Sequence, residues 1–172
     1  MTVLRLISPD DAPELAALLR ASREHLAPWD PIRPENYFTV QGQRDEIRVA
    51  LQGHAQGTRA PFVILDDDGA IAGRLNLNTI VRGAFESASL GYWVAADRVG
   101  RGLATRAVSA AVEHGFQRLQ LHRLEAGTLL HNEASQRVLR KNGFTEFGLA
   151  PGYLKIQGQW QDHRLFQLLA PR

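Results

Sequence analysis

Alternating and continuous apolar segments predict most of a β-sheet in this chain. Three of them follow one another between residues 62 and 94, separated by short polar turns, and Asp67-Asp68-Gly69 is typical of a hairpin. Strands this close along the chain usually pair antiparallel. The charged run 66–68 is interpreted as a solvent-exposed turn. The expected strands are residues 2–7, 62–65, 71–81, 87–94, 121–129, 144–147 and 160–169.

Apolar residues three or four positions apart predict four helices between these strands. They begin near residues 8, 34, 102 and 132, with Pro34 at a first helical position and Gly143 closing the last helix. The third helix joins strands 87–94 and 121–129, and such a crossover makes them parallel. We therefore predict an α/β (α+β) fold with a mixed, mostly antiparallel central sheet of about seven strands, flanked by about four helices.

The composition fits a small enzyme. The 172 residues, 44% of them apolar, suit a single domain over 1–172. A net charge of +2 gives no sign of direct nucleic-acid binding, and no stretch is long and apolar enough to suggest a membrane partner. Cysteine is absent and the six histidines lack metal-ligand spacing, so neither a thiol nucleophile nor a metal site is expected. No signal peptide is visible, and the expected location is the cytoplasm.

A glycine-containing turn between the strand at 87–94 and the following helix predicts a phosphate-binding site. Gly100 and Gly102 allow a ligand to approach the backbone, and the unpaired N–H groups at a helix start favour an anion. Arg101 adds a guanidinium to the same turn. The turn is therefore expected to hold the phosphates of a nucleotide or cofactor.

Two nucleotide-binding patterns fit this turn poorly. A P-loop requires Gly-Lys-Ser/Thr, which does not follow these glycines. A dinucleotide-binding fingerprint has a third small residue and an acid at the end of the next strand, whereas this chain has Thr105 and places Glu125 inside the next expected strand. The antiparallel strands before the turn also differ from a Rossmann arrangement, which is kept only as an alternative.

The segment from Val99 to Ala104, Val-Gly-Arg-Gly-Leu-Ala, resembles the acyl-CoA turn of the GCN5-related N-acetyltransferases (GNAT), Gln/Arg-x-x-Gly-x-Gly/Ala. Val99 departs from the pattern at a position that usually contacts the pyrophosphate. Further segments resemble the RimJ/RimL-like branch, which acetylates the N-termini of ribosomal proteins. They are His25–Asp30, His131–Ser135 followed by Val138–Phe144, and Tyr153–His163.

The resemblance implies acetyl-CoA as the co-substrate and a strand that diverges from its neighbour near Tyr92. Backbone N–H groups there would polarise the thioester, and Gly91 would permit a bulge. Asn132 would orient the pantetheine arm. The implied cofactor-binding residues are Tyr92, Trp93, Val94, Val99, Gly100, Arg101, Gly102, Leu103, Ala104, Thr105, Asn132 and Ser135.

The resemblance also implies catalytic groups. Ser135 would assist the departing thiolate, although a serine at a helix start can simply cap the helix. Many relatives carry a tyrosine acid one turn later, but that position is Leu139. Glu125 would be the base, acting through water, unless it is only an ion-paired strand residue. Asp162 and His163 are reserve candidates, with a structural role preferred for the aspartate.

Aromatic residues near expected loops suggest how an amine acceptor is enclosed. Trp29, Tyr37 and Tyr153 are the candidates, while Trp160 is assigned to packing. The predicted function is direct acetyl transfer to a primary amine, most simply a protein N-terminal α-amine of the ribosomal-protein alanine type. Acetylation of a small amine and a non-catalytic CoA-binding module stay open as alternatives. An exposed strand near the C-terminus would allow a homodimer.

Overall fold

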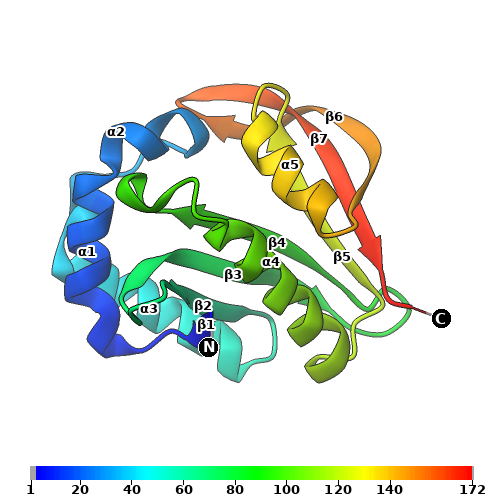
Figure 1. Ribbon diagram of the computed structural model, residues 1–172, viewed down its shortest axis with the longest axis horizontal. Coiled ribbons are helices and arrows are strands. Elements are labelled where there is room, and N and C mark those ends of the chain that lie inside the picture. The colour runs from blue at the N-terminus through cyan, green and yellow to red at the C-terminus, as the bar shows by residue number, and fades with distance from the viewer. Residues whose placement is uncertain (1–2, 172) are drawn as a thin grey trace.

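A seven-stranded sheet forms the centre of the computed structural model, which describes residues 3–171 (Figure 1). The strand order is β1-β2-β3-β4-β5-β7-β6, and every neighbouring pair is antiparallel except β4 and β5. The predicted mixed, mostly antiparallel sheet is therefore confirmed. The strands are β1 Leu4–Leu6, β2 Ala60–Leu65, β3 Ile71–Val81, β4 Ser87–Val94, β5 Arg123–Leu129, β6 Thr145–Ile156 and β7 Gln159–Leu169.

The described residues form five α-helices around the sheet, one more than expected. The additional helix is α2, a single turn that continues into a 3₁₀ turn at Ala27–Trp29. Pro34 precedes a separate 3₁₀ helix at Glu35–Phe38 instead of beginning α3, which starts at Val40 and is capped by Thr39 accepting the Gly42 N–H at 3.0 Å. The helices are α1 Ala12–Ala21, α2 Arg23–Leu26, α3 Val40–Ala55, α4 Leu103–Glu113 and α5 Glu133–Lys141.

Alternate residues of the central strands belong to two separate cores. In β4, Leu90 packs into the larger core with α4 and α5, as Tyr92 does along its margin, while Trp93 packs against the smaller core with α1 and α3. The period of two along a strand produces this division, because successive side chains point to opposite faces. The sheet thus separates an α4/α5 face from an α1/α3 face.

β4 and β5 pair only at one end. Their register covers three positions, from Ser87 opposite Arg123 to Ser89 opposite Glu125. Beyond these pairs the two strands diverge, so the sheet opens into a V whose arms are visible in Figure 1. The expected divergence near Tyr92 is confirmed, and it leaves the backbone of β4 beyond Ser89 without a partner on the β5 side.

The wide end of the V is bridged by the turn between β6 and β7. Gln157 Nε2 donates to the carbonyl oxygen of Ala27 at 2.6 Å and to that of Asp30 at 3.2 Å. In Figure 1 the α2 segment and the β6–β7 turn accordingly lie close together above the opening. Two segments remote in sequence thus enclose the region where the sheet divides.

Candidate active site

A cleft of about 450 Å³ lies on the α4/α5 face, between the end of β4 and the N-termini of α4 and α5. Of the residues expected to bind the cofactor, all but Arg101 line it. The predicted residues that the cleft brings together lie up to 43 positions apart, from Tyr92 to Ser135. The predicted lining residues are Tyr92, Trp93, Val94, Val99, Gly100, Gly102, Leu103, Ala104, Thr105, Asn132 and Ser135.

The glycine turn has the backbone conformation that its sequence suggested. Gly100 and Gly102 have φ of +78° and +73°, in the left-handed region that other residues occupy at a cost. A β-carbon at either position would meet nothing within 4 Å, so conformation rather than crowding explains both glycines. No side chain caps α4 at Gly102, so the first N–H groups of the helix are available at the cleft for an anion.

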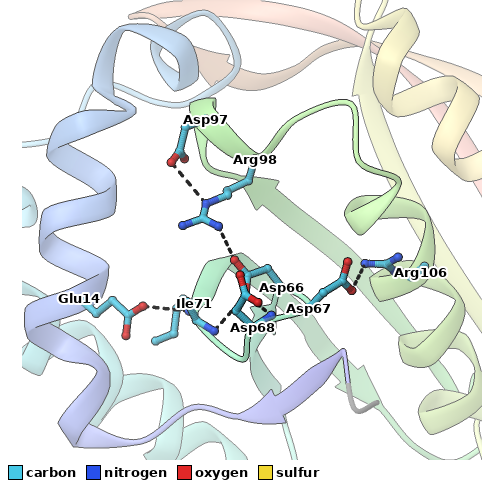
Figure 2. Close-up of polar contacts among 9 residues, drawn as sticks. Glu14, Asp66, Asp67, Asp68, Ile71, Asp97, Arg98 and Arg106 are labelled. Carbon is cyan, nitrogen blue, oxygen red and sulfur yellow. Dashed lines mark hydrogen bonds and ion pairs between the residues drawn. The ribbon is translucent and has the colours of Figure 1, made fainter.

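The acidic run in the β2–β3 hairpin holds the loop before this turn (Figure 2). The interpretation of residues 66–68 as a solvent-exposed turn is wrong for Asp66, which is buried and forms an ion pair with Arg98. Its other oxygen accepts the N–H groups of Asp68 and Ala70, each at 3.0 Å. Asp67 pairs with Arg106 of α4 at 3.0 Å. The hairpin is therefore fastened to both sides of the glycine turn.

A tyrosine and a serine meet at the inner end of the cleft. The phenol oxygen of Tyr92 lies 2.8 Å from Ser135 Oγ, and the Ser135 N–H donates to Asn132 Oδ1 at 3.1 Å. Burial raises the pKa of Tyr92 to about 12, although the hydrogen bond with Ser135 acts in the opposite direction. The phenol therefore keeps its proton at neutral pH. The expected tyrosine position one turn later holds Leu139, which is fully buried in the core.

A second cavity, of about 340 Å³, lies on the α1/α3 face. Trp29 and Tyr37 line it, as expected for acceptor-binding residues. Arg33 stacks over the Tyr37 ring at 4.6 Å and pairs with Asp30 at 2.9 Å. Burial is the main cause that raises the pKa of Tyr37. The wall formed by Trp29 and Tyr37 is thus aromatic, and the positive charge of Arg33 beside it is neutralised by Asp30.

The two cavities share Leu26, Trp29, Tyr92 and Trp93. Tyr92 and Trp93 point to opposite faces of β4, so the cavities adjoin through the opening of the V. A thioester lying in the cleft and an amine lying in the second cavity would meet beside the unpartnered backbone of β4. This arrangement fits a transfer reaction between two substrates that approach from opposite faces of the sheet.

Glu125 and Tyr153 line neither cavity. Glu125 faces the end of β5 that still pairs with β4, where its carboxylate forms an ion pair with Arg123. Tyr153 belongs to β6 rather than to a loop, and its ring packs against His163 at 5.4 Å. The structure therefore groups most of the predicted site residues but leaves these two apart.

The reserve candidates have structural contacts. Asp162 Oδ1 accepts the Gly152 N–H at 2.8 Å, which agrees with the preferred structural role. His163 is buried, and its Nδ1 lies 3.0 Å from the carbonyl oxygen of Gln161. The expected bulge at Gly91 is absent, because its register with Asn76 is continuous. Gly91 instead lines the second cavity, where a β-carbon would have no neighbour closer than 3.8 Å.

Polar residues on β3 form the part of the second cavity that sequence reasoning missed. Arg74, Asn76 and Asn78 line it, and they alternate with Leu75 and Leu77 of the larger core. That alternation of polar and apolar positions was the available signal, because a polar residue at every second position of a central strand must face something other than the core. Glu46 of α3 and Arg59 also border the cavity.

The described residues contain neither a metal-ligand cluster nor a membrane-spanning helix. Within 3–171, no group of three or more histidine, cysteine or acidic side chains is arranged to hold a metal ion. Over the same range, no helix combines the length and apolar character required to cross a membrane.

The family of this chain is shown by its similarity to known acetyltransferases. Residues 2–145 match the family model described as an acetyltransferase (GNAT) domain, so the chain belongs to this family. Ribosomal protein uS5-alanine N-acetyltransferase of Escherichia coli is 35% identical over 98% of this chain and 88% of its own length. The protein is thus an N-acetyltransferase enzyme.

Solved structures agree with this assignment. RimJ of Mycobacterium smegmatis, in complex with CoA-disulfide, superposes with a TM-score of 0.93 at 35% identity, over 97% of this chain and 81% of the other. Ribosomal-protein-S5-alanine acetyltransferase from Vibrio fischeri superposes with a TM-score of 0.91 at 33% identity, over 96% and 91%. The predicted resemblance to the RimJ/RimL-like branch is confirmed.

Proposed function

We propose that this N-acetyltransferase moves the acetyl group of acetyl-CoA directly to the α-amine at the N-terminus of a protein, of the ribosomal-protein alanine type. The observation that carries the proposal is the meeting of two cavities, one on each face of the sheet, at Tyr92 and Trp93. The relatives uS5-alanine N-acetyltransferase and ribosomal-protein-S5-alanine acetyltransferase, which align with nearly the whole chain, support the choice of acceptor. Such chemistry would take place in the cytoplasm.

The donor cleft suits acetyl-CoA. The free N–H groups at the start of α4 and the left-handed turn at Gly100 and Gly102 offer donors to a pyrophosphate. Val99 is half exposed beside them and adds only apolar contact. Acetyl-CoA bound in this way would supply an activated thioester carbonyl. The unpartnered N–H groups of β4 beyond Ser89 are the proposed donors that polarise it.

Ser135 is the proposed proton donor to the leaving group. When the amine attacks the carbonyl carbon, the carbon–sulfur bond breaks and its electron pair goes to sulfur. The Ser135 hydroxyl would then give its proton to the thiolate, and the Tyr92 phenol, which is protonated at neutral pH, would replace that proton on Ser135 Oγ and regain one from solvent. Within the described residues, no histidine or carboxylate hydrogen-bonds to this serine, and the chain has no cysteine. Direct transfer is therefore favoured over an acyl-enzyme.

The proton lost by the amine needs an acceptor on the other face. Glu125 stays our proposed base. Because its carboxylate is paired with Arg123, it can act only through a water molecule and only after this ion pair opens. The simpler route releases the proton to solvent in the acceptor-side cavity. A Glu125→Gln variant separates the two, because only the first route predicts a changed pH profile of kcat/KM.

The test is release of CoA thiol from acetyl-CoA across unblocked peptides that begin with Ala, Ser or Met, beside a panel of small amines. Each peptide is paired with an N-terminally blocked copy of the same sequence as its control. Turnover on unblocked peptides alone is the expected result. Turnover on small amines alone would replace the proposed acceptor, and acetyl-CoA binding with no turnover on any acceptor would reassign the protein as a CoA-binding module.

A further inference from the structure

Arg74 is a buried cation without a partner. It lies on β3 with 7% of its surface exposed, and it forms no hydrogen bond or ion pair through its side chain within residues 3–171. Its Nε is enclosed and unsatisfied. Burial lowers the pKa of this guanidinium, although Tyr37 and Glu46 act in the opposite direction. An uncompensated buried charge is costly, and such a site is completed when a ligand supplies the partner.

The arginine faces the acceptor-side cavity at the place where the acetyl group would be transferred. It lines that cavity and lies directly opposite Trp93 in the β3–β4 register, and Trp93 is shared by both cavities. The next residue on the same face, Asn76, lies opposite Gly91 and has a buried Oδ1 without a partner. Arg74 and Asn76 thus present unused hydrogen-bonding groups side by side beside the transfer point.

The charged residues that line the cavity include one more arginine than acid, and Arg74 is the buried arginine among them. The arginines that line it are Arg33, Arg59 and Arg74, and the acids are Asp30 and Glu46, which gives three positive and two negative charges. Arg33 is paired with Asp30. Arg59 and Glu46 are both exposed to solvent, where their charges are screened. Arg74 is therefore the buried arginine of this lining that has no acidic partner within residues 3–171.

We propose that Arg74 binds a carboxylate of the acceptor, so that this enzyme selects amines that carry an acidic group close to the reactive nitrogen. The inference rests on the proposed function, because it concerns the same acceptor. A carboxylate matches a guanidinium better than a neutral carbonyl oxygen does, since it accepts two parallel hydrogen bonds and neutralises the charge. The Arg74 fork would fix the position of the carboxylate, while Asn76 Oδ1, an acceptor, would take an N–H of the acceptor amine.

The carboxylate can come from two sources with the same chemistry. It can be the side chain of an acidic residue next to the N-terminal residue of a peptide. The backbone of Arg74 lies about 5 Å from that of Trp93, the residue shared by both cavities, so Arg74 is within reach of such a side chain. It can also be the terminal carboxylate of a very short acceptor. Amidated peptides with Glu or Gln at the second or third residue test the first source, and the dipeptide Ala-Gly against its amide tests the second.

The experiment compares kcat/KM for each acidic and neutral pair, in the parent enzyme and in Arg74→Met, Arg74→Lys and Arg44→Met variants. We expect the parent to prefer the acidic member by about tenfold or more, mainly through KM. Arg74→Met should bring the ratio close to one, and Arg74→Lys should retain part of it. Arg44 is exposed on α3 and lines no cavity, so Arg44→Met makes the same change in net charge and should keep the preference.

A preference that survives in Arg74→Met, or equal kcat/KM for every pair in the parent, would overturn the inference while the proposed function stands. If no peptide is acetylated, the proposed acceptor fails, and calorimetry on the CoA-saturated protein decides the inference separately with the same ligands. Tighter binding of the acidic member that is lost in Arg74→Met supports it. Equal binding of both members, or no binding of either, refutes it. Thermal midpoints no lower than that of the parent confirm that the variants are folded.

Discussion

Replacing Ser135 with alanine should slow acetyl transfer without weakening the binding of acetyl-CoA. The hydroxyl lies 2.8 Å from the Tyr92 phenol, an ordinary distance for an O–H···O hydrogen bond. The helix start survives the change, because the backbone N–H of residue 135, rather than its side chain, bonds to Asn132. The substitution therefore removes one proton donor and little else.

The expected size of the effect follows from the chemistry of the leaving group. A positioned general acid contributes about 10²- to 10⁴-fold, and a thiolate leaves readily because a thiol has a pKa of about 8.5. We therefore expect Ser135→Ala to lower kcat by the lower end of this range, about 10²-fold, which corresponds to about 2.7 kcal/mol in activation free energy. Tyr92→Phe keeps the serine hydroxyl and removes only the hydrogen bond behind it, which should lower kcat about tenfold.

The double variant provides the decisive measurement. If Tyr92 acts through Ser135, adding Tyr92→Phe to Ser135→Ala should cost no more than about twofold, so the two effects are not additive. Ser135→Thr, which restores a hydroxyl, should recover much of the rate. Steady-state kcat by CoA release and affinity for acetyl-CoA by calorimetry are the assays. A Ser135→Ala rate within threefold of the parent, or losses that multiply in the double variant, would refute the proposed relay.

Four further changes test other parts of the structure. Gly91→Val should raise KM for the peptide about tenfold and leave CoA affinity unchanged in calorimetry, because the added methyl groups enter the acceptor-side cavity. Gly102→Ala should lower the free energy of unfolding by about 1–2 kcal/mol in thermal denaturation and weaken CoA binding, since its φ is +73°. Asp66→Asn should cost about 2–3 kcal/mol in urea denaturation, and the exposed Asp67→Asn less than about 1 kcal/mol; equal losses would contradict the burial argument. The pKa of Tyr92 is about 12 in the folded protein and about 10 in the unfolded chain, so the unfolded chain binds fewer protons between pH 10 and 12. The free energy of unfolding should therefore fall by about 2.7 kcal/mol across this range, which is two pH units at about 1.36 kcal/mol each. Tyr92→Phe should lack this decline.

The strands that the sequence predicted best are those with uninterrupted patterns. The bounds of β3 and β4 agree with the expected ranges, because alternation and a hairpin turn mark both. β6 was predicted as four residues and has twelve, since Pro151 and Gly152 interrupt its pattern and a register shift accommodates them. An edge strand tolerates such residues, because one side of it has no ladder to break.

The site divides in the same way between local and long-range information. The glycine turn is contiguous in sequence, so its conformation and its place at the start of α4 could be predicted. The position of Glu125 depends on where β4 stops pairing with β5, and no local pattern records that point. The contact between Tyr92 and Ser135 joins residues 43 positions apart and arises only from packing across the V. A buried arginine at position 74 likewise becomes informative only when its surroundings are known.

The placement of the two cavities on opposite faces of the sheet has a kinetic consequence. Each substrate has its own entrance, so neither needs to leave for the other to be exchanged. Spent CoA can depart past α4 and α5 while a protein surface stays docked against the α1/α3 side. Substrate addition should therefore be random in order, and a large acceptor should not compete with the cofactor in product-inhibition experiments.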